Sequence, residues 1–324
     1  MSGPRKRPAK QARSVVRNPR EGAGSVQQNK RDAGKGRGAG KGGAAPSKAG
    51  RKPGSPAKGG RKPGPPTVRS AERGLDGTQV EGRHAVRELL LAGTRRAREV
   101  LIAEDMDAAD ILTDIVDLAH DLKVPVREIS KRRLDAESRT EASQGVVARA
   151  DALRAVPLAD LAAGAPGGPP PFLLALDGVT DPGNLGAIIR TAECAGVTGL
   201  LLPKHRAVHV TPTVTKAAAG AVEHVPMTLV GGLPAAIEEM RKYGVWIVGL
   251  DAGGEKSLHR AALGDQPVCL VVGAEGEGLS RLVRQRCDEI VSIPLLGSLS
   301  SLNVSTAAAL AIYEVVRHRA EAKA

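Results

Sequence analysis

The stretch SIPLLGSLSSLNVSTAAALAIYE, residues 292–314, decides how the rest of this chain is interpreted. The apolar run 290–296 predicts a buried strand, and the Ala-, Leu- and Val-rich end predicts a helix that opens near Leu302. One polar side chain is enough to cap a helix. Either capping or a ligand-facing site therefore explains each of the polar residues that crowd the turn: Ser298, Ser300, Ser301, Asn303 and Ser305.

The length and composition bound the class of protein. A chain of 324 residues can hold about two domains with separate cores. It has no apolar run of about 18 residues and no apolar segment after its basic beginning, so we expect no membrane span, no signal peptide and a cytoplasmic protein. Three widely separated cysteines, Cys194, Cys269 and Cys287, indicate neither a disulfide framework nor a zinc site.

The net charge of +12 is concentrated in the first 73 residues. They contain 20 Lys or Arg and three acidic side chains, a net charge of +17, which leaves −5 for residues 74–324. This segment, 1–73, also lacks aromatic side chains and is predicted to be a disordered tail. Its expected role is a non-specific hold on nucleic-acid phosphates, with a merely solubilising tail as the alternative.

Residues 78–150 predict a small α/β domain. The expected order is a helix over 82–93, a strand over 98–104, an amphipathic helix over 108–123, a strand over 124–129, a short basic helix near 131–134 and a strand over 145–150. In the amphipathic helix Ile111, Ile115, Leu118 and Leu122 are predicted to share the apolar face. The basic run that begins at Lys131 is either an RNA contact or a solvated face.

Residues 151–171 are rich in Pro and Gly and predict a linker, and residues 172–320 predict a second domain. Its near-continuous apolar runs are expected strands at 172–179, 199–203, 245–252, 268–275 and 289–296. Such runs are typical of strands buried on both faces, so we expect an α/β fold with a parallel sheet between two layers of helices. Ligands of open parallel sheets bind beyond the carboxyl ends of the strands.

Three of these strand ends carry polar or glycine-rich sequence. The first, 176–197, has a turn at residues 181–183, Asn184 as a helix N-cap candidate and Arg190 farther along the same helix. The second, 271–280, contains Glu275 and glycines that let the backbone approach a ligand closely. The third is the opening stretch. We find no G-x-G-x-x-G after a strand, no P-loop, no metal-ligand cluster and no Ser/His/Asp pattern.

Together these segments resemble the three motifs of the SpoU/TrmH family of RNA ribose 2′-O-methyltransferases, of the SPOUT superfamily. The matching patterns are N-L-G-x-x-x-R from residue 184, V-x-G-x-E-G-x-G from residue 271 and I-P-L-x-G-x-x-x-S-L-N-V-S from residue 293. The resemblance covers about residues 78–320 and is strongest to the branch that methylates a guanosine of 23S rRNA. That branch has an RNA-binding domain like a ribosomal protein, with a start like the G-R-H-A-V at residues 82–86.

The resemblance implies a sheet whose C-terminal segment threads a loop to form a deep trefoil knot, although threaded chains are rare among folds. It further implies a homodimer, for which the last helix, 302–320, is the candidate interface. The implied cofactor is S-adenosylmethionine, bound in the knot against the backbone of Gly273, Ile293 and Leu302. No metal is implied.

The resemblance assigns catalysis to Arg190, with Asn184, Glu275, Ser301 and Asn303 as polar companions. The family proposal makes Arg190 the base that accepts the hydroxyl proton. A guanidinium is normally only a donor, so a clamp on the target phosphate is the physically easier role, and Glu275 is then either the base or a structural carboxylate. Ser301 and Asn303 are expected to orient Arg190 and the substrate, and Asn303 is also expected to cap the last helix.

Three functions therefore remain possible: methylation of a 23S rRNA guanosine, methylation of a tRNA guanosine or of an rRNA nucleotide that governs antibiotic resistance, and non-catalytic RNA binding in ribosome assembly.

The four aromatic residues, Phe172, Tyr243, Trp246 and Tyr313, are predicted to lie in the core or in strands. Stacking of bases then lacks a platform, so recognition is expected to depend on phosphates, 2′-hydroxyls and shape.

Overall fold

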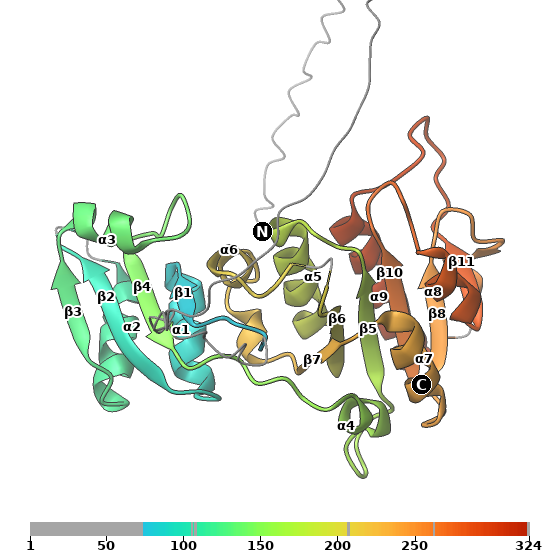
Figure 1. Cartoon of the computed structure of the whole chain (residues 1–324), viewed down its shortest axis with the longest axis horizontal. Helices are drawn as coiled ribbons and strands as arrows, with labels where there is room; N and C mark the ends of the chain where they lie inside the picture. Colours follow the sequence, from blue (N-terminus) through green and yellow to red (C-terminus); the bar gives the residue numbers. More distant parts are fainter. Residues whose placement is uncertain (1–73, 105, 107–108, 206–207, 262, 323–324) are drawn as a thin grey trace, which may run out of the picture. The chain divides into compact units, whose positions relative to one another are not determined.

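The computed structural model describes residues 74–104, 106, 109–205, 208–261 and 263–322. In these residues the principal strands form two sheets, of four and of seven strands (Figure 1). The basic tail, residues 1–73, lies outside the described residues, so its disorder stays a prediction.

The four-stranded sheet and its helices form what we call the four-stranded module. The strand order is β1-β4-β2-β3, in which β2 and β3 are parallel and the other two pairs are antiparallel. Each predicted element is present, with a short first strand in addition. The elements are β1 (Gln79–Glu81), α1 (Arg83–Ala92), β2 (Ala97–Ala103), α2 (Asp110–Asp121), β3 (Val126–Ile129), α3 (Lys131–Glu137) and β4 (Val146–Ala150).

The predicted apolar face of α2 is confirmed except at its end. Ile115 is fully buried, and Ile111 and Leu118 are partly buried and pack against the same core, which also contains Leu112 and Ala119. Leu122 is half exposed, because it follows the last residue of the helix.

The seven-stranded sheet and its helices form the seven-stranded module. The strand order is β7-β6-β5-β10-β8-β11-β9, and all pairs are parallel. Its elements are β5 (Phe172–Asp177), α5 (Pro182–Cys194), β6 (Gly199–Pro203), α6 (Pro212–Ala217), η1 (Ala221–Glu223), β7 (Met227–Val230), α7 (Leu233–Arg241), β8 (Trp246–Leu250), β9 (Lys256–Ser257), η2 (Leu258–Arg260), β10 (Val268–Gly273), α8 (Arg281–Arg286), β11 (Glu289–Ser292) and α9 (Val304–Glu321).

This sheet is covered on both faces, as the continuous apolar runs predicted. Successive side chains of β5 enter different cores, because strand residues alternate between the faces of a sheet. Leu174 packs with Ile188 of α5 and with residues of α6 and α9, whereas Leu173 packs in the other core with residues of α7 and α8. The expected α/β fold with a doubly covered parallel sheet is confirmed.

The segment 151–171 contains structure that the sequence did not reveal. Helix α4 (Leu158–Ala163) buries Leu158, Leu161 and Ala162 against the core beside α7. With one and a half turns the helix is too short for a helical period to stand out, so its burial was decided by the neighbouring sheet.

The last strand is shorter than the predicted 289–296, because β11 ends at Ser292 and residues 293–303 form no regular element. The start of the last helix is confirmed. Asn303 is the N-cap of α9, and its Oδ1 accepts from the backbone N–H of Ser305 at 2.9 Å. Helix α9 then packs against α5 and β10 in the same core.

Among the described residues, no helix is both long enough and apolar enough to cross a membrane.

Candidate active site

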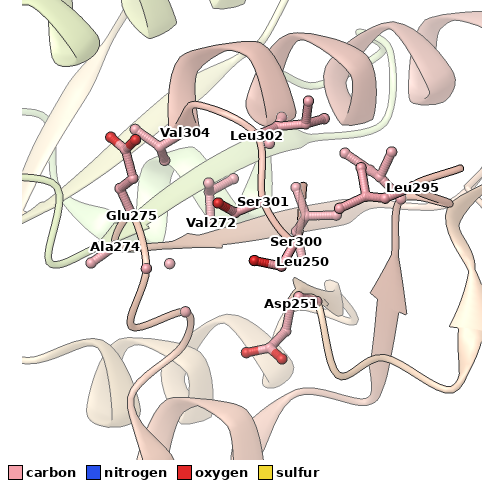
Figure 2. A pocket seen from close by; sticks show the side chains of 16 residues that line it. Leu250, Asp251, Val272, Ala274, Glu275, Leu295, Ser300, Ser301, Leu302 and Val304 are labelled. Carbon is pink, nitrogen blue, oxygen red and sulfur yellow. The ribbon is translucent and has the colours of Figure 1, made fainter. Parts of the chain in front are cut away.

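A pocket opens at the carboxyl ends of β8 and β10, and we call it the strand-end pocket (Figure 2). Its third wall is the irregular stretch after β11, together with the first turn of α9. The hydroxyls of Ser300 and Ser301 point into the space between these walls, and Glu275 and Asp251 lie at its opposite edges. The lining residues are Leu250, Asp251, Ala252, Val272, Gly273, Ala274, Glu275, Gly276, Gly278, Ile293, Leu295, Ser300, Ser301, Leu302, Val304 and Ala307.

The wall formed by β10 depends on Gly273. A Cβ atom at this position would lie 2.2 Å from the carbonyl carbon of Gly278, which is closer than real Cβ contacts. The close approach exists because residues 274–278 fold back on themselves: Ala274 donates to the Gly278 carbonyl at 3.1 Å, and Gly278 donates back at 3.0 Å. Gly276 and Gly278 have positive φ angles of 79° and 67° in this turn.

Two carboxylates at strand ends hold the far side of this loop. Asp177, the last residue of β5, accepts from the backbone N–H of Ser280 at 2.7 Å. Asp251, the residue after β8, accepts from the backbone N–H of Leu279 at 3.1 Å through one oxygen. Its other oxygen accepts from the N–H of Gly253 at 2.9 Å and from Arg284.

These contacts set the charge of Asp251. Burial favours the neutral acid, but the backbone N–H groups of Gly253 and Leu279 and the guanidinium of Arg284 favour the carboxylate more strongly. The net effect holds the pKa of Asp251 below its ordinary value of 3.8. Asp251 therefore stays ionised near neutral pH, as the acidic partner of an ion pair with Arg284 at the pocket wall.

The composition of the strand-end pocket fits S-adenosylmethionine. Leucine, isoleucine, valine and alanine side chains supply an apolar lining for an adenine ring, and backbone groups of residues 273–276 lie at the surface beside them. Of the residues that the structure describes, two carboxylates, Glu275 and the Arg284-paired Asp251, line this pocket, and no Lys, Arg or His does. Such walls favour the positive charge of a sulfonium over an anionic ligand such as a nucleotide triphosphate.

The structure brings together five of the eight residues that the sequence singled out. The three predicted cofactor residues, Gly273, Ile293 and Leu302, all line the strand-end pocket, as do Glu275 and Ser301. They come from β10 and its loop and from the stretch after β11, whose strands are separated in the sheet by β8.

Two more of these residues form a pair beside the pocket. The side-chain amide of Asn303 donates to Oδ1 of Asn184 at 3.0 Å, which joins the first turn of α5 to the start of α9. The prediction that Asn184 caps its helix is wrong. Asp181 is the N-cap and accepts from the backbone N–H of Asn184 at 2.7 Å, with Pro182 as the first helical residue instead of part of a separate turn.

Arg190 is the eighth residue, and it does not line the strand-end pocket. It is exposed on α5 and lines a second hollow with Glu193 and Cys194 of the same helix. Within the described part of the chain, its guanidinium has no hydrogen-bond or ion-pair partner. An unpaired cation at the surface is available to a ligand that approaches from solvent.

Two carboxylates that hold the loop after β10, Asp251 and Asp177, were not predicted from the sequence. Asp177 ends an apolar strand and Asp251 directly follows one, so the rule that located the other strand ends could have included them. They were overlooked because a single Asp after a strand is also an ordinary turn residue.

The prediction that the aromatic residues lie in the core or in strands is only partly confirmed. Phe172 is buried and Trp246 lies in β8, but Tyr243, Trp246 and Tyr313 are 41%, 37% and 50% exposed, so aromatic surface does exist. Lys216 of α6 donates through Nζ to the carbonyl of Ala142 in the four-stranded module.

No cluster of three or more His, Cys, Asp or Glu side chains suited to a metal ion occurs in the parts of the chain that the structure describes.

Comparison with known families matches most of the chain outside the tail. Residues 171–313 match the SpoU rRNA methylase family, and residues 79–156 match the RNA 2′-O ribose methyltransferase substrate-binding family. The two matched segments coincide closely with the seven-stranded and four-stranded modules.

Individual relatives agree with these matches. The 23S rRNA (guanosine-2′-O-)-methyltransferase RlmB of Yersinia pestis is 40% identical over 241 residues, which is 74% of this chain and 97% of the relative. RlmB of Ralstonia nicotianae is 44% identical over 209 residues, 64% of this chain and 83% of the relative.

A solved structure extends the likeness to the fold. The SpoU methyltransferase AviRb from Streptomyces viridochromogenes, crystallised in complex with AdoMet, superposes with a TM-score of 0.62 at 27% sequence identity. The match covers 75% of this chain and 90% of AviRb.

Proposed function

Because this chain belongs to the SpoU rRNA methylase family, we propose that it transfers the methyl group of S-adenosylmethionine to the 2′-hydroxyl of a guanosine ribose in 23S rRNA. The observation that carries this proposal is the strand-end pocket, in which the residues of two motifs, far apart in the sequence, line one cavity of suitable chemistry. The substrate follows the relatives from Yersinia pestis and Ralstonia nicotianae.

The strand-end pocket would hold S-adenosylmethionine, which supplies the methyl group and its positive sulfonium when bound. The backbone of Gly273, Ile293 and Leu302 would bind the adenine, and the apolar lining would exclude water. The carboxylate of Glu275, which has no ion-pair partner among the described residues, would favour the cationic cofactor over the neutral product that remains after transfer.

Arg190 would clamp the target phosphate and stabilise the alkoxide that develops on the ribose. Its position on the exposed face of α5, without a protein partner among the described residues, supports a role toward a large substrate in solvent. A guanidinium is a poor base. Glu275, at the edge of the pocket, is therefore our candidate for the group that accepts the hydroxyl proton.

Ser301, Asn303 and Asn184 would position the reacting groups. The bond between Asn303 and Asn184 links the helix that carries Arg190 to the start of α9. Because the cap of α9 uses Oδ1 of Asn303 and the link to Asn184 uses its amide nitrogen, one side chain fixes both helices. In-line placement of the hydroxyl and the methyl group depends on such fixed geometry.

Residues 78–150 would bind RNA, residues 151–171 would connect the domains, and residues 172–320 would form the methyltransferase domain. The match of residues 79–156 to the substrate-binding family supports this division. The basic tail, 1–73, would add a non-specific hold on phosphates, since residues 74–324 carry a net charge of −5.

The methyltransferase domain would contain the trefoil knot of its superfamily. After β11, next to the edge of the sheet, the chain returns to the middle, where α9 packs against α5 and β10. This return path supports a threaded C-terminal segment.

The protein would act as a homodimer in the cytoplasm, with α9 in the subunit interface. Leu310 and Tyr313 of α9 are about half exposed, and Leu296 and Leu299 in the preceding loop are 99% and 79% exposed. Apolar side chains at these levels of exposure support coverage by a second subunit.

The test is transfer of labelled methyl from S-adenosylmethionine to unmodified large-subunit rRNA, followed by mapping of the labelled nucleotide. We expect label on one guanosine ribose and a loss of at least about 100-fold in rate for Arg190→Ala, as for removal of one preorganised donor. A matched control is Arg281→Ala, since Arg281 is an exposed arginine on α8 with no partner among the described residues.

Other outcomes would redirect the assignment. Label on tRNA instead of rRNA, or on an rRNA nucleotide where methylation confers antibiotic resistance, would replace the substrate but keep the reaction. RNA binding without methyl transfer, together with no binding of S-adenosylmethionine, would favour a non-catalytic role in ribosome assembly.

A further inference from the structure

The hollow that contains Arg190 is formed by both modules, and we call it the α1–α5 hollow. Helix α1 contributes His84 and Glu88, which are one helical turn apart, and α5 contributes Arg190, Glu193 and Cys194. His224, just after η1, lies on the remaining side. The cavity has a volume of about 440 Å³, within the range of small-molecule pockets.

The contacts beneath this hollow fix its two walls to each other. Arg95 of the four-stranded module makes a two-pronged ion pair with Glu223 of η1, at 2.6 and 2.9 Å, and their side chains are only 4% and 0% exposed. Gly220 lies so close to α1 that a Cβ atom there would be 2.4 Å from Cβ of Glu88. The hollow is therefore a built feature of the fold, held by buried contacts.

The polar groups of the hollow match a nucleotide better than a simple anion. Arg190 and His84 are exposed and have no hydrogen-bond partner among the described residues, so both can donate to a phosphate. Glu88 is already paired with His224 at 3.1 Å and with Arg87 at 3.5 Å. The carboxylate of Glu193, which has no partner in the described part of the chain, can accept from a ribose hydroxyl or a base amino group.

His84 also joins the α1–α5 hollow to a second cavity that lies within the four-stranded module. That cavity is lined by the polar or charged side chains of Arg83, Lys131, Asp135 and Gln144 and by the apolar side chains of Met106, Ile111 and Leu134, besides His84 itself. A chain of nucleotides that passes from one cavity to the other must cross His84. The two cavities together offer cations for successive phosphates and apolar surface for a base.

We propose that the α1–α5 hollow binds the RNA nucleotide next to the methylated ribose, and that His84 is the residue that positions this nucleotide by contacting its phosphate. The inference rests on the proposed function and deepens it, because it assigns the four-stranded module a direct part in placing the target beside Arg190. RNA then enters over α3, crosses His84 and reaches the catalytic face of α5.

The first test compares His84→Ala with His120→Ala. His120 is a matched control because its side chain is 89% exposed on α2 of the same module and does not line either cavity. Affinity for an rRNA fragment is measured by fluorescence anisotropy with S-adenosylhomocysteine present, so that no methyl transfer is needed. We expect the Kd for RNA to rise about tenfold in His84→Ala and to stay unchanged in His120→Ala.

Two further readouts separate positioning from a loss of structure. Cofactor affinity and the melting temperature should match the wild type in both variants, because His84 is exposed and has no hydrogen-bond or ion-pair partner among the described residues. In turnover with the active enzyme, the KM for RNA should rise much more than kcat falls. Unchanged RNA affinity in His84→Ala would overturn the inference.

The chain carries its own probe for the second test, because Cys194 lines the hollow and is exposed. Burial raises the pKa of the Cys287 thiol to about 12, and Cys269 is fully buried with its pKa also raised. Thiolates are the reactive species, so iodoacetamide should alkylate Cys194 selectively. We expect bound RNA to slow this alkylation and S-adenosylhomocysteine alone to leave it unchanged.

The outcomes distinguish the proposed nucleotide-binding role of the α1–α5 hollow from the proposed methyltransferase activity. If RNA binds and Cys194 stays fully reactive, the subsite is wrong even if methyl transfer occurs. If RNA protects Cys194 and His84→Ala weakens binding but the wild type transfers no methyl group, the subsite stands and the proposed activity is wrong. If rRNA does not bind, both are wrong.

Discussion

At Gly273 a missing side chain shapes the candidate cofactor site. The backbone of Gly278 occupies the space that a Cβ atom would need, so the loop after β10 can close only over a glycine. The sequence indicated that glycines here allow close approach to a ligand. The structure adds that the backbone closest to Gly273 is that of the following loop, at Gly278.

We predict that Gly273→Ala weakens binding of S-adenosylmethionine. The added methyl group must displace the backbone of Gly278, which costs about 1–3 kcal/mol by analogy with overpacked cores. Isothermal titration should show a Kd at least about tenfold higher, since a factor of ten corresponds to about 1.4 kcal/mol.

The matched control is Gly231→Ala, where an added Cβ would meet no atom within 4 Å and the backbone does not adopt a positive φ. This variant should bind the cofactor like the wild type. Equal affinity for S-adenosylmethionine in both variants would contradict this prediction, because it would show that the loop can shift without weakening cofactor binding.

Asp251 leads to a prediction about pH. Both of its oxygens accept hydrogen bonds, from Leu279 on one side and from Gly253 and Arg284 on the other. In Asp251→Asn an amide NH2 group replaces one of the two oxygens. This group is a donor and cannot accept the hydrogen bonds that the lost oxygen accepted, so the variant should unfold at a lower urea concentration at pH 7.

The sign of the pH dependence follows from the lowered pKa of Asp251. The carboxylate stabilises the folded state above the unfolded value of 3.8, and this contribution is lost as the pH falls through the lower folded value. The stability gap between wild type and Asp251→Asn should therefore narrow below about pH 4 in urea titrations. The exposed Asp265→Asn is the control, and a gap that stays constant into this acidic range would contradict the explanation.

At the scale of elements, helix α9 connects the candidate site to the body of the domain. Its first turn lines the strand-end pocket, and Arg319, near its other end, donates to the carbonyls of Pro170 and Pro171 at 2.9 Å and of Gln266 at 3.2 Å. The guanidinium also lies 5.1 Å from the ring centroid of Phe172. Both ends of this helix are thus held by polar contacts to distant segments.

We predict that Arg319→Lys lowers the free energy of unfolding by about 1–3 kcal/mol. The three carbonyls are placed to accept from the planar guanidinium group, and the single ammonium group of lysine cannot donate to all of them. Urea denaturation followed by circular dichroism would measure the loss. Arg317→Lys is the control on the same helix, since Arg317 is exposed and its two ion pairs, with the buried Glu314 and the exposed Glu321, stay within one turn of α9. Equal effects of the two substitutions would mean that the partly buried contacts of Arg319 stabilise the fold no more than the ion pairs of Arg317 do.

At the scale of the whole molecule, charge separates the tail from the rest. The tail, 1–73, has a net charge of +17, whereas residues 74–324 have a net charge of −5. An acidic folded part has little general attraction for RNA, so its specific sites need either local cations such as Arg190 or help from the tail.

We predict that deletion of residues 1–73 weakens RNA binding and flattens its salt dependence. Each lost contact with a phosphate of single-stranded nucleic acid reduces the slope of log K against log salt by about 0.7. Binding of S-adenosylmethionine should stay unchanged. A full-length variant with Ser in place of the 20 Lys and Arg of the tail controls for length, and an unchanged salt slope in either variant would contradict the role of the tail.

The sequence alone determined the fold class and five of the residues that line the strand-end pocket, because both depend on residues close together in the chain. Apolar runs fixed which strands are buried, and Gly273, Ile293 and Leu302 were found because each lies in a motif of contiguous residues. Asn303 was identified as a helix cap because capping depends on residues within one turn of the chain.

Tertiary structure decided what depends on residues far apart in the sequence. Asp251 became a loop anchor only because β8 lies beside β10, and Asn184 gained a partner 119 positions away in place of its predicted cap. The approach of His84 to Arg190 depends on the buried pair of Arg95 and Glu223, 128 residues apart. Hydrophobic pattern encodes which face of an element is buried, but not which other element will cover it.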